Sequence, residues 1–233
     1  ETGQFDRLYL KDPGGLVTPE RARTLIPALK AAIAVPLEFH SHCTIGLAPF
    51  SYPEAALLGA SCLHTSSSSA ANGTGQPAMT PTIANLRDLG LTVDVDDEAV
   101  AEMDAWFTAL ARAEGLSHGT PGEFDRSYFR HQMPGGMMGT MKRQLAEMKR
   151  LHLLPQVLEE VERVRAALGY PIMVTPFPQM VMSQALFNVI GERRYAQVSD
   201  QVLRYVMGKF GHPTSPINPA VEAAILDRPR ARE

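Results

Sequence analysis

The sequence contains no run of about 18 apolar residues, the length that a transmembrane helix requires. Its two cysteines, Cys43 and Cys62, are too few for a disulfide framework and are typical of a reducing compartment. Neither sign of charge is in excess, because 22 basic and 25 acidic residues leave a net charge of −3. The charge pattern therefore gives no nucleic-acid or membrane signature, and we expect a cytoplasmic protein.

The chain begins at Glu1 rather than at methionine and enters an apolar segment without a signal peptide. We therefore expect it to be a piece of a longer protein that extends on the N-terminal side. The composition, 45% hydrophobic and 20% charged, is that of a globular protein with one large domain or two small ones.

The first part of the chain alternates between strand and helix patterns. Residues 5–10, 37–42 and 61–65 are predicted strands, and residues 52–58 are a predicted helix. Another helix is expected to follow the N-cap Thr18, with Pro19 in its first turn and a kink at Pro27. The first two units repeat about every 30 residues, which predicts a parallel sheet or a β/α barrel.

Beyond residue 92 the pattern becomes helical. One helix is indicated by Val100, Met103, Phe107 and Leu110, and another by Val157, Val161, Val164 and Leu168. Further helices are expected near residues 180–190 and 198–208. The sequence therefore predicts two domains: an α/β part at residues 1–92 and an all-helical part at residues 93–233.

The segment from Pro36 to Thr44 contains the pair His40 and His42. Residues two apart in a strand point to the same face, so both imidazoles can reach one metal ion. The alternative is a pair of ordinary polar residues at the end of a strand. Lys11 and His64 also lie at predicted strand ends, where β/α barrels place their chemistry.

Two loops are candidates for ligand contact. The loop at residues 66–77 continues directly from a strand, which favours a substrate-facing loop over a flexible connector. The Met-rich segment at residues 133–138 is either a hydrophobic corner or, through Gly135 and Gly136, a close approach of the backbone to a ligand.

Several motifs occur in one order along the chain: KDPGGL at 11–16, HSHCT at 40–44, GTGQP at 73–77, QMPGGM at 132–137, VTP at 174–176 and PINP at 216–219. This order resembles the carboxyltransferase domain of biotin-dependent enzymes: pyruvate carboxylase, the oxaloacetate decarboxylase α subunit and the transcarboxylase subunit. The resemblance implies the last three βα units of a TIM-type (β/α)8 barrel, followed by a helical C-terminal domain.

The resemblance also implies a divalent metal site with zinc, manganese or cobalt. Its ligands in this chain are His40, His42 and a carbamylated Lys11, and an Asp comes from a first strand outside the chain. Carbamylation converts the ammonium of Lys11, which repels a cation, into a carboxylate-like oxygen donor. Taken alone, Lys11 is typical of a surface lysine at a strand end.

The implied reaction is carboxyl transfer between carboxybiotin and a small 2-oxo acid such as pyruvate or oxaloacetate. The implied biotin-binding residues are Gly135, Gly136 and Thr140. The implied catalytic residues are Lys11 and Thr140, of which Thr140 is the proton shuttle. The family places that hydroxyl at position 139, where this chain has Gly. The implied partners are a biotin carboxyl carrier, the N-terminal half of the barrel and further copies of the chain.

Other departures from the family leave alternatives open. The family has Asp at position 43, and Cys43 either ligates the metal or is a small buried group. His64, at another position where Asp is common, either joins the site or hydrogen-bonds in the core, and Gly75 replaces a Ser. A biotin-independent lyase of the hydroxymethylglutaryl-CoA lyase type and a non-catalytic subunit are the competing functions.

Three strands cannot close a barrel, which needs about eight. Parallel edges and apolar faces are then left uncovered. We therefore expect the isolated 233 residues to be poorly soluble or partly disordered, and gel filtration with circular dichroism tests this. A monodisperse monomer that melts cooperatively would contradict it.

Overall fold

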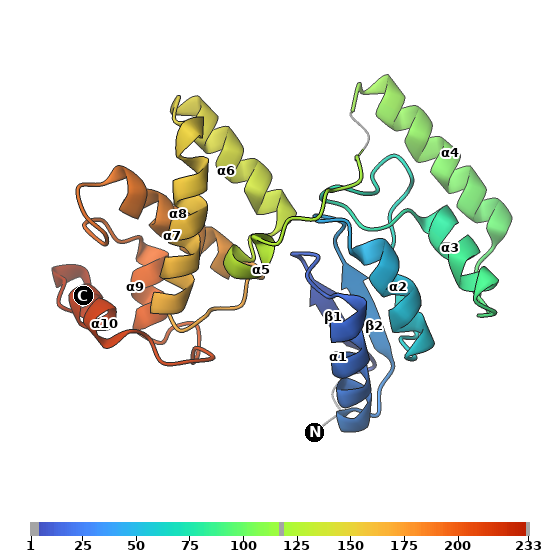
Figure 1. The fold of residues 1–233 in the computed structure, drawn as a ribbon, viewed down its shortest axis with the longest axis horizontal. Coiled ribbons are helices and arrows are strands. Elements are labelled where there is room, and N and C mark those ends of the chain that lie inside the picture. The colour runs from blue at the N-terminus through green and yellow to red at the C-terminus, as the bar shows by residue number, and fades with distance from the viewer. Residues whose placement is uncertain (1–4, 117–118, 232–233) are drawn as a thin grey trace. The chain divides into compact units, whose positions relative to one another are not determined.

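The computed structural model describes residues 5–116 and 119–231, which form two compact units, residues 1–126 and 127–233 (Figure 1). The first unit contains β1 (Leu8–Asp12), α1 (Pro19–Ala32), β2 (Leu37–Ser41), α2 (Ala48–Leu57), β3 (Cys62–Leu63), α3 (Met79–Asp88) and α4 (Asp97–Ala113). The expected division after residue 92 counts α4 with the helical part, whereas α4 lies in the first compact unit. Where the family's domain division falls stays a prediction.

The strands form a parallel sheet in the order β1-β2-β3, as the alternation of patterns predicts. One face of the sheet is buried by Leu37 and Phe39, which pack against α1 and α2. The alternating residues Tyr9, Lys11, Glu38 and His40 lie on the opposite face, which the helices leave uncovered. The sheet therefore has one apolar face toward its helices and one face rich in polar and aromatic groups.

Several element boundaries differ from those expected. Strand β1 covers residues 8–12 rather than 5–10, so Lys11 lies inside the strand instead of after it, and Phe5 is 50% exposed. Helix α1 continues through Pro27, and α2 begins at Ala48 rather than at residue 52 because Pro49 fits its first turn.

All regular secondary structure among the described residues of the second unit is helical. The unit contains α5 (Tyr128–His131), α6 (Gly135–Glu147), η1 (Leu151–Leu153), α7 (Leu154–Ala167), α8 (Phe177–Ile190), α9 (Asp200–Val206), α10 (Pro219–Leu226) and η2 (Pro229–Ala231). Its core forms around α7 and α8, and the predicted apolar positions of α7 are fully buried. By contrast, three of the four apolar positions predicted for α4 are exposed: Met103, Phe107 and Leu110. Helical spacing thus identified both helices but not what each one packs against.

No described helix combines the length and the apolar character needed to cross a membrane.

The buried carboxylate of Asp12 holds the loop after β1 in place. Its oxygens accept hydrogen bonds from the backbone nitrogens of Leu16 (2.9 Å) and Val17 (2.8 Å) and from Ser41 Oγ (2.8 Å). Removing a buried acceptor leaves these donors unpaired. We expect Asp12→Ala to lower the free energy of unfolding by about 2–4 kcal/mol, measured by urea unfolding. The exposed Asp88→Ala is the control, and an equal loss there would contradict this role.

Candidate metal centre

The uncovered face of the sheet is arranged in two rows of side chains. In the first row, the strand register places Tyr9 beside Glu38 and Glu38 beside Cys62. In the second row, two residues further along the strands, Lys11 lies beside His40. The backbone nitrogen of His64 donates to Phe39 O, which brings His64 next to the second row. The Tyr52 hydroxyl, buried beneath, donates to His64 O (2.6 Å) and accepts from Ser41 N (3.0 Å), so the ends of β2 and β3 are tied together.

His40 and His42 point their ring nitrogens at each other, as the sequence predicts. The two Nε2 atoms are 3.0 Å apart. His42 Nδ1 lies 2.6 Å from the carbonyl oxygen of Thr74, which can only accept a hydrogen bond. The neutral ring of His42 therefore carries its proton on Nδ1, and its Nε2 lone pair faces His40.

The residues around this pair suit a divalent cation. Gln76 Nε2 lies 3.2 Å from His40 Nε2 and 3.3 Å from His42 Nε2. Its amide is oriented by Ser66 Oγ, which donates to Gln76 Oε1 at 2.9 Å. The amide nitrogen of Gln76 can therefore donate to both imidazole Nε2 atoms. A divalent cation would interact with the same two lone pairs.

The electrostatic surroundings keep His40 neutral. Burial lowers the pKa of His40 to about 4, and the neighbouring His42, His64 and Lys11 contribute to this lowering in that order. A neutral imidazole is the form that binds a metal. Lys11 is exposed and lies in register with His40, so its side chain shares the face on which a carbamate oxygen would have to lie.

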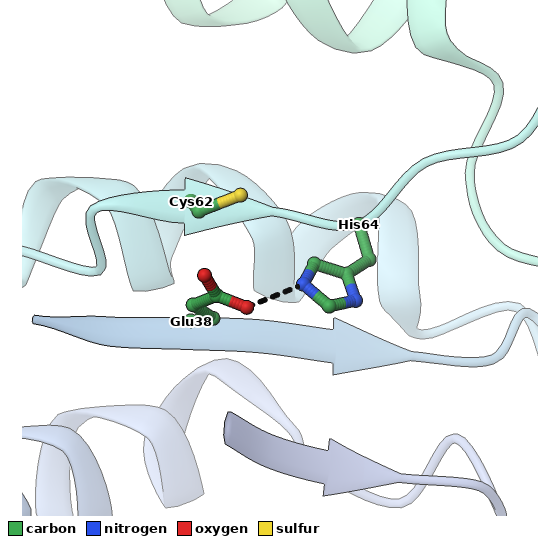
Figure 2. Close-up of side chains that lie close together, drawn as sticks. All are labelled: Glu38, Cys62 and His64. Carbon is green, nitrogen blue, oxygen red and sulfur yellow. Dashed lines mark hydrogen bonds and ion pairs between the residues drawn. The ribbon is translucent and has the colours of Figure 1, made fainter. Parts of the chain in front are cut away.

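His64, Glu38 and Cys62 form a second cluster on the same face. Figure 2 shows the Glu38 carboxylate bonded to the His64 ring, with Oε2 and Nε2 3.0 Å apart, and Cys62 on the neighbouring strand. One donor atom from each of the three residues lies within 4.8 Å of the others. His64 Nδ1 also lies 3.4 Å from His40 Nδ1, so His64 adjoins the site instead of lying in the helix-covered core.

Cys43 lies in the apolar core of the first unit. It is 1% exposed in the core between β2 and α2, and burial raises the pKa of its thiol to about 11. These facts favour the buried role over metal ligation. The Gly at position 75, where the family has Ser, also has a structural reason, because a Cβ there would lie 2.3 Å from Ala70 O. The loop at residues 66–77 contacts the site through Thr74 and Gln76.

Gly135, Gly136 and Thr140 lie in the second unit, near the beginning of α6. The Thr140 hydroxyl donates to Gly136 O at 3.2 Å, as helical Thr side chains commonly do. Because neighbouring helix positions differ by about 100° in direction, Thr140 does not point where a side chain at 139 would. The catalytic role of Thr140 and the biotin-binding roles of Gly135 and Gly136 stay predictions.

Position 139 allows a direct test of the helix. Gly139 lies inside α6, and a Cβ added there meets nothing within 4 Å. We expect Gly139→Ala to raise the free energy of unfolding by about 0.5–1 kcal/mol, because alanine is the better helix former. Urea unfolding measures it. Gly169→Ala should have the opposite sign, since Gly169 has φ +76° and its Cβ would lie 2.1 Å from Ser215 O.

Sequence reasoning missed Glu38, Tyr9 and Gln76. The period of two would have found the first two, because Tyr9 precedes Lys11 by two residues and Glu38 precedes His40 by two. Gln76 lies in the GTGQP motif and in the loop at residues 66–77, which the sequence does indicate, but neither shows that its side chain reaches His42, 34 residues earlier.

Comparison with known proteins relates the chain to carboxylases and carboxyltransferases. Residues 129–233 match the family model described as the conserved carboxylase domain. Over 223 residues the chain is 35% identical to a pyruvate carboxylase subunit of Methanocaldococcus jannaschii, covering 95% of this chain and 39% of that protein. The resemblance to the carboxyltransferase segment of pyruvate carboxylase and its relatives is confirmed.

Two further proteins show how broad the likeness is. The chain is 30% identical to the methylmalonyl-CoA carboxyltransferase 5S subunit of Propionibacterium freudenreichii, over 93% of this chain and 43% of that one. The solved carboxyl transferase domain of Rhizobium etli pyruvate carboxylase with pyruvate matches with a TM-score of 0.83 and 23% identity, over 96% of this chain and 39% of that chain. The chain thus spans about two fifths of the length of these proteins, and the structural match supports the α/β fold.

Proposed function

We propose that the full protein transfers a carboxyl group between carboxybiotin and a small carboxylic acid at a divalent metal site. The observation that carries this proposal is the convergence of His40 Nε2 and His42 Nε2 at 3.0 Å, beside Lys11 on the same face of the sheet. Two imidazoles and an oxygen donor form a mixed ligand set that suits zinc, manganese or cobalt.

Each candidate residue has a distinct task in this proposal. His40 and His42 hold the cation through Nε2, and a carbamylated Lys11 adds an oxygen. The bound cation stabilises negative charge that develops on the acceptor next to its carbonyl group. Thr140 holds and returns the proton exchanged between biotin and the acceptor, next to the helix start formed by Gly135 and Gly136.

The acceptor is proposed to be a 2-oxo acid. Proteins similar to this chain include pyruvate carboxylase subunits, a 2-oxoglutarate carboxylase large subunit of Hydrogenobacter thermophilus and a methylmalonyl-CoA carboxyltransferase subunit. Two of these names specify 2-oxo acids, which favours that class over a coenzyme A thioester.

The proposal also needs parts beyond these residues. We propose that the three-stranded sheet is the last part of a β/α barrel, whose N-terminal strands cover its open face and supply the Asp ligand. A biotin carboxyl carrier protein or domain brings the biotin, and the assembly is proposed to be a homo-oligomer.

Carboxyl exchange by the full-length protein tests this function. The assay supplies a biotinylated carrier, labelled oxaloacetate or pyruvate, and 2-oxoglutarate as a second acceptor. We expect exchange that stops after chelation and returns with Zn²⁺, Mn²⁺ or Co²⁺. Absence of exchange with every short 2-oxo acid, with carrier and metal present, would reject the proposal.

A further inference from the structure

A line of hydrogen-bonding atoms leads from the protein surface to His40. Arg7 NH1 donates to Glu38 Oε1 at 3.0 Å, and Glu38 Oε2 lies 3.0 Å from His64 Nε2 (Figure 2). On the other side of the same ring, His64 Nδ1 lies 3.4 Å from His40 Nδ1. The ring of Tyr9 stacks on His64, with centroids 4.7 Å apart and planes 25° apart, which holds the imidazole in this orientation.

The carboxylate of Glu38 sets the direction of these hydrogen bonds. Its Oε1 accepts from the Arg7 guanidinium, and its Oε2 faces His64 Nε2 as an acceptor. This carboxylate favours the His64 tautomer with its proton on Nε2, which leaves a lone pair on Nδ1. A His40 ring that gives its Nε2 lone pair to a cation carries its proton on Nδ1, where it faces that lone pair of His64.

We propose that His64 and Glu38 are positioning residues that place the proton of His40 on Nδ1 and present its Nε2 lone pair to the cation. Thr74 O accepts from His42 Nδ1 in the same way, which leaves the Nε2 lone pair of His42 for the same cation, 3.0 Å from Nε2 of His40. Metal-bound histidines commonly donate their second nitrogen to a carboxylate, and here one more imidazole lies between ligand and carboxylate. The inference rests on the proposed metal centre.

Glu38, Cys62 and His64 also offer donors for a cation of their own. A cation on His64 Nε2 would move the ring proton to Nδ1, where it would face the Nδ1 proton of His40 across 3.4 Å. Two donors in contact repel each other, so this arrangement and a cation on His40 Nε2 oppose one another. With His40 as a ligand, the geometry favours the hydrogen-bonded series from Glu38 through His64 to His40, which we call the relay.

Metal affinity of the full-length protein tests the relay, with Zn²⁺ binding measured by equilibrium dialysis and Co²⁺ binding by absorption. His64→Leu removes the acceptor and is expected to weaken binding about 10- to 100-fold. His64→Asn keeps an acceptor, because its Oδ1 is bonded to Cγ as Nδ1 is in histidine, and should retain affinity to within about threefold. Glu38→Leu should cost about 10-fold, and Glu38→Gln, which still accepts from Nε2, should cost less.

Three outcomes would overturn the relay. Equal losses in His64→Leu and His64→Asn would mean that the ring merely packs. Unchanged affinity in His64→Leu, while His40→Ala abolishes binding, would refute the relay and leave the metal centre standing. A second cation in wild type, with a thiolate-to-cobalt absorption band lost in Cys62→Ser but not in Cys43→Ala, would show that the cluster binds metal itself. If His40→Ala binds metal normally, the proposed metal centre fails first.

Discussion

Replacing His40 by alanine should lower the affinity of the full protein for Zn²⁺ by more than about 100-fold and reduce carboxyl exchange to background. Changes in groups that only orient a ligand cost about 10- to 100-fold in affinity, and removing the ligand itself should cost more. His40 Nε2 is one of two imidazole nitrogens that lie 3.0 Å apart, and Gln76 offers only an amide in its place. Equilibrium dialysis gives the affinity, and exchange of labelled oxaloacetate gives the activity.

His42→Ala should match His40→Ala, because the two Nε2 atoms are equivalent in this site. His152→Ala is the matched control, since His152 is exposed in η1 of the second unit. Retention of both metal and activity by His40→Ala and His42→Ala would favour the non-catalytic interpretation. An equal loss in His152→Ala would mean that the assay reports general damage.

The order of strands and helices could be predicted because each is a local pattern. The approach of His40 to His42 was predicted from their spacing of two, although β2 ends at Ser41 and His42 lies just after the strand. Gln76 and Asp12 were not found, because their roles depend on contacts between segments far apart in sequence: Gln76 reaches His40, and Asp12 accepts from Ser41. Likewise, the apolar stripe of α4 predicts a helix, but only the folded chain shows that most of this stripe is exposed.

Replacing Lys11 by alanine should reduce carboxyl exchange by at least about 100-fold, and a short carboxylic acid such as acetate should partly restore it. A metal contributes several kcal/mol to charge stabilisation, and this contribution depends on its complete ligand set. The truncated side chain leaves space beside His40, its neighbour across the sheet, where a free carboxylate can supply the missing oxygen. Exchange rates with and without acetate measure both effects.

The same variant decides whether Lys11 carries carbon dioxide. Intact mass in bicarbonate buffer should show one added carbon dioxide unit in wild type, absent in Lys11→Ala and present in the control Lys142→Ala, whose lysine is exposed on α6. A wild-type protein that exchanges carboxyl groups with unmodified Lys11 would contradict the proposed ligand set. Metal-dependent cleavage without biotin, with Lys11 also unmodified, would instead favour the lyase-type chemistry, because a lysine that stays an ammonium cannot ligate the cation that His40 and His42 hold.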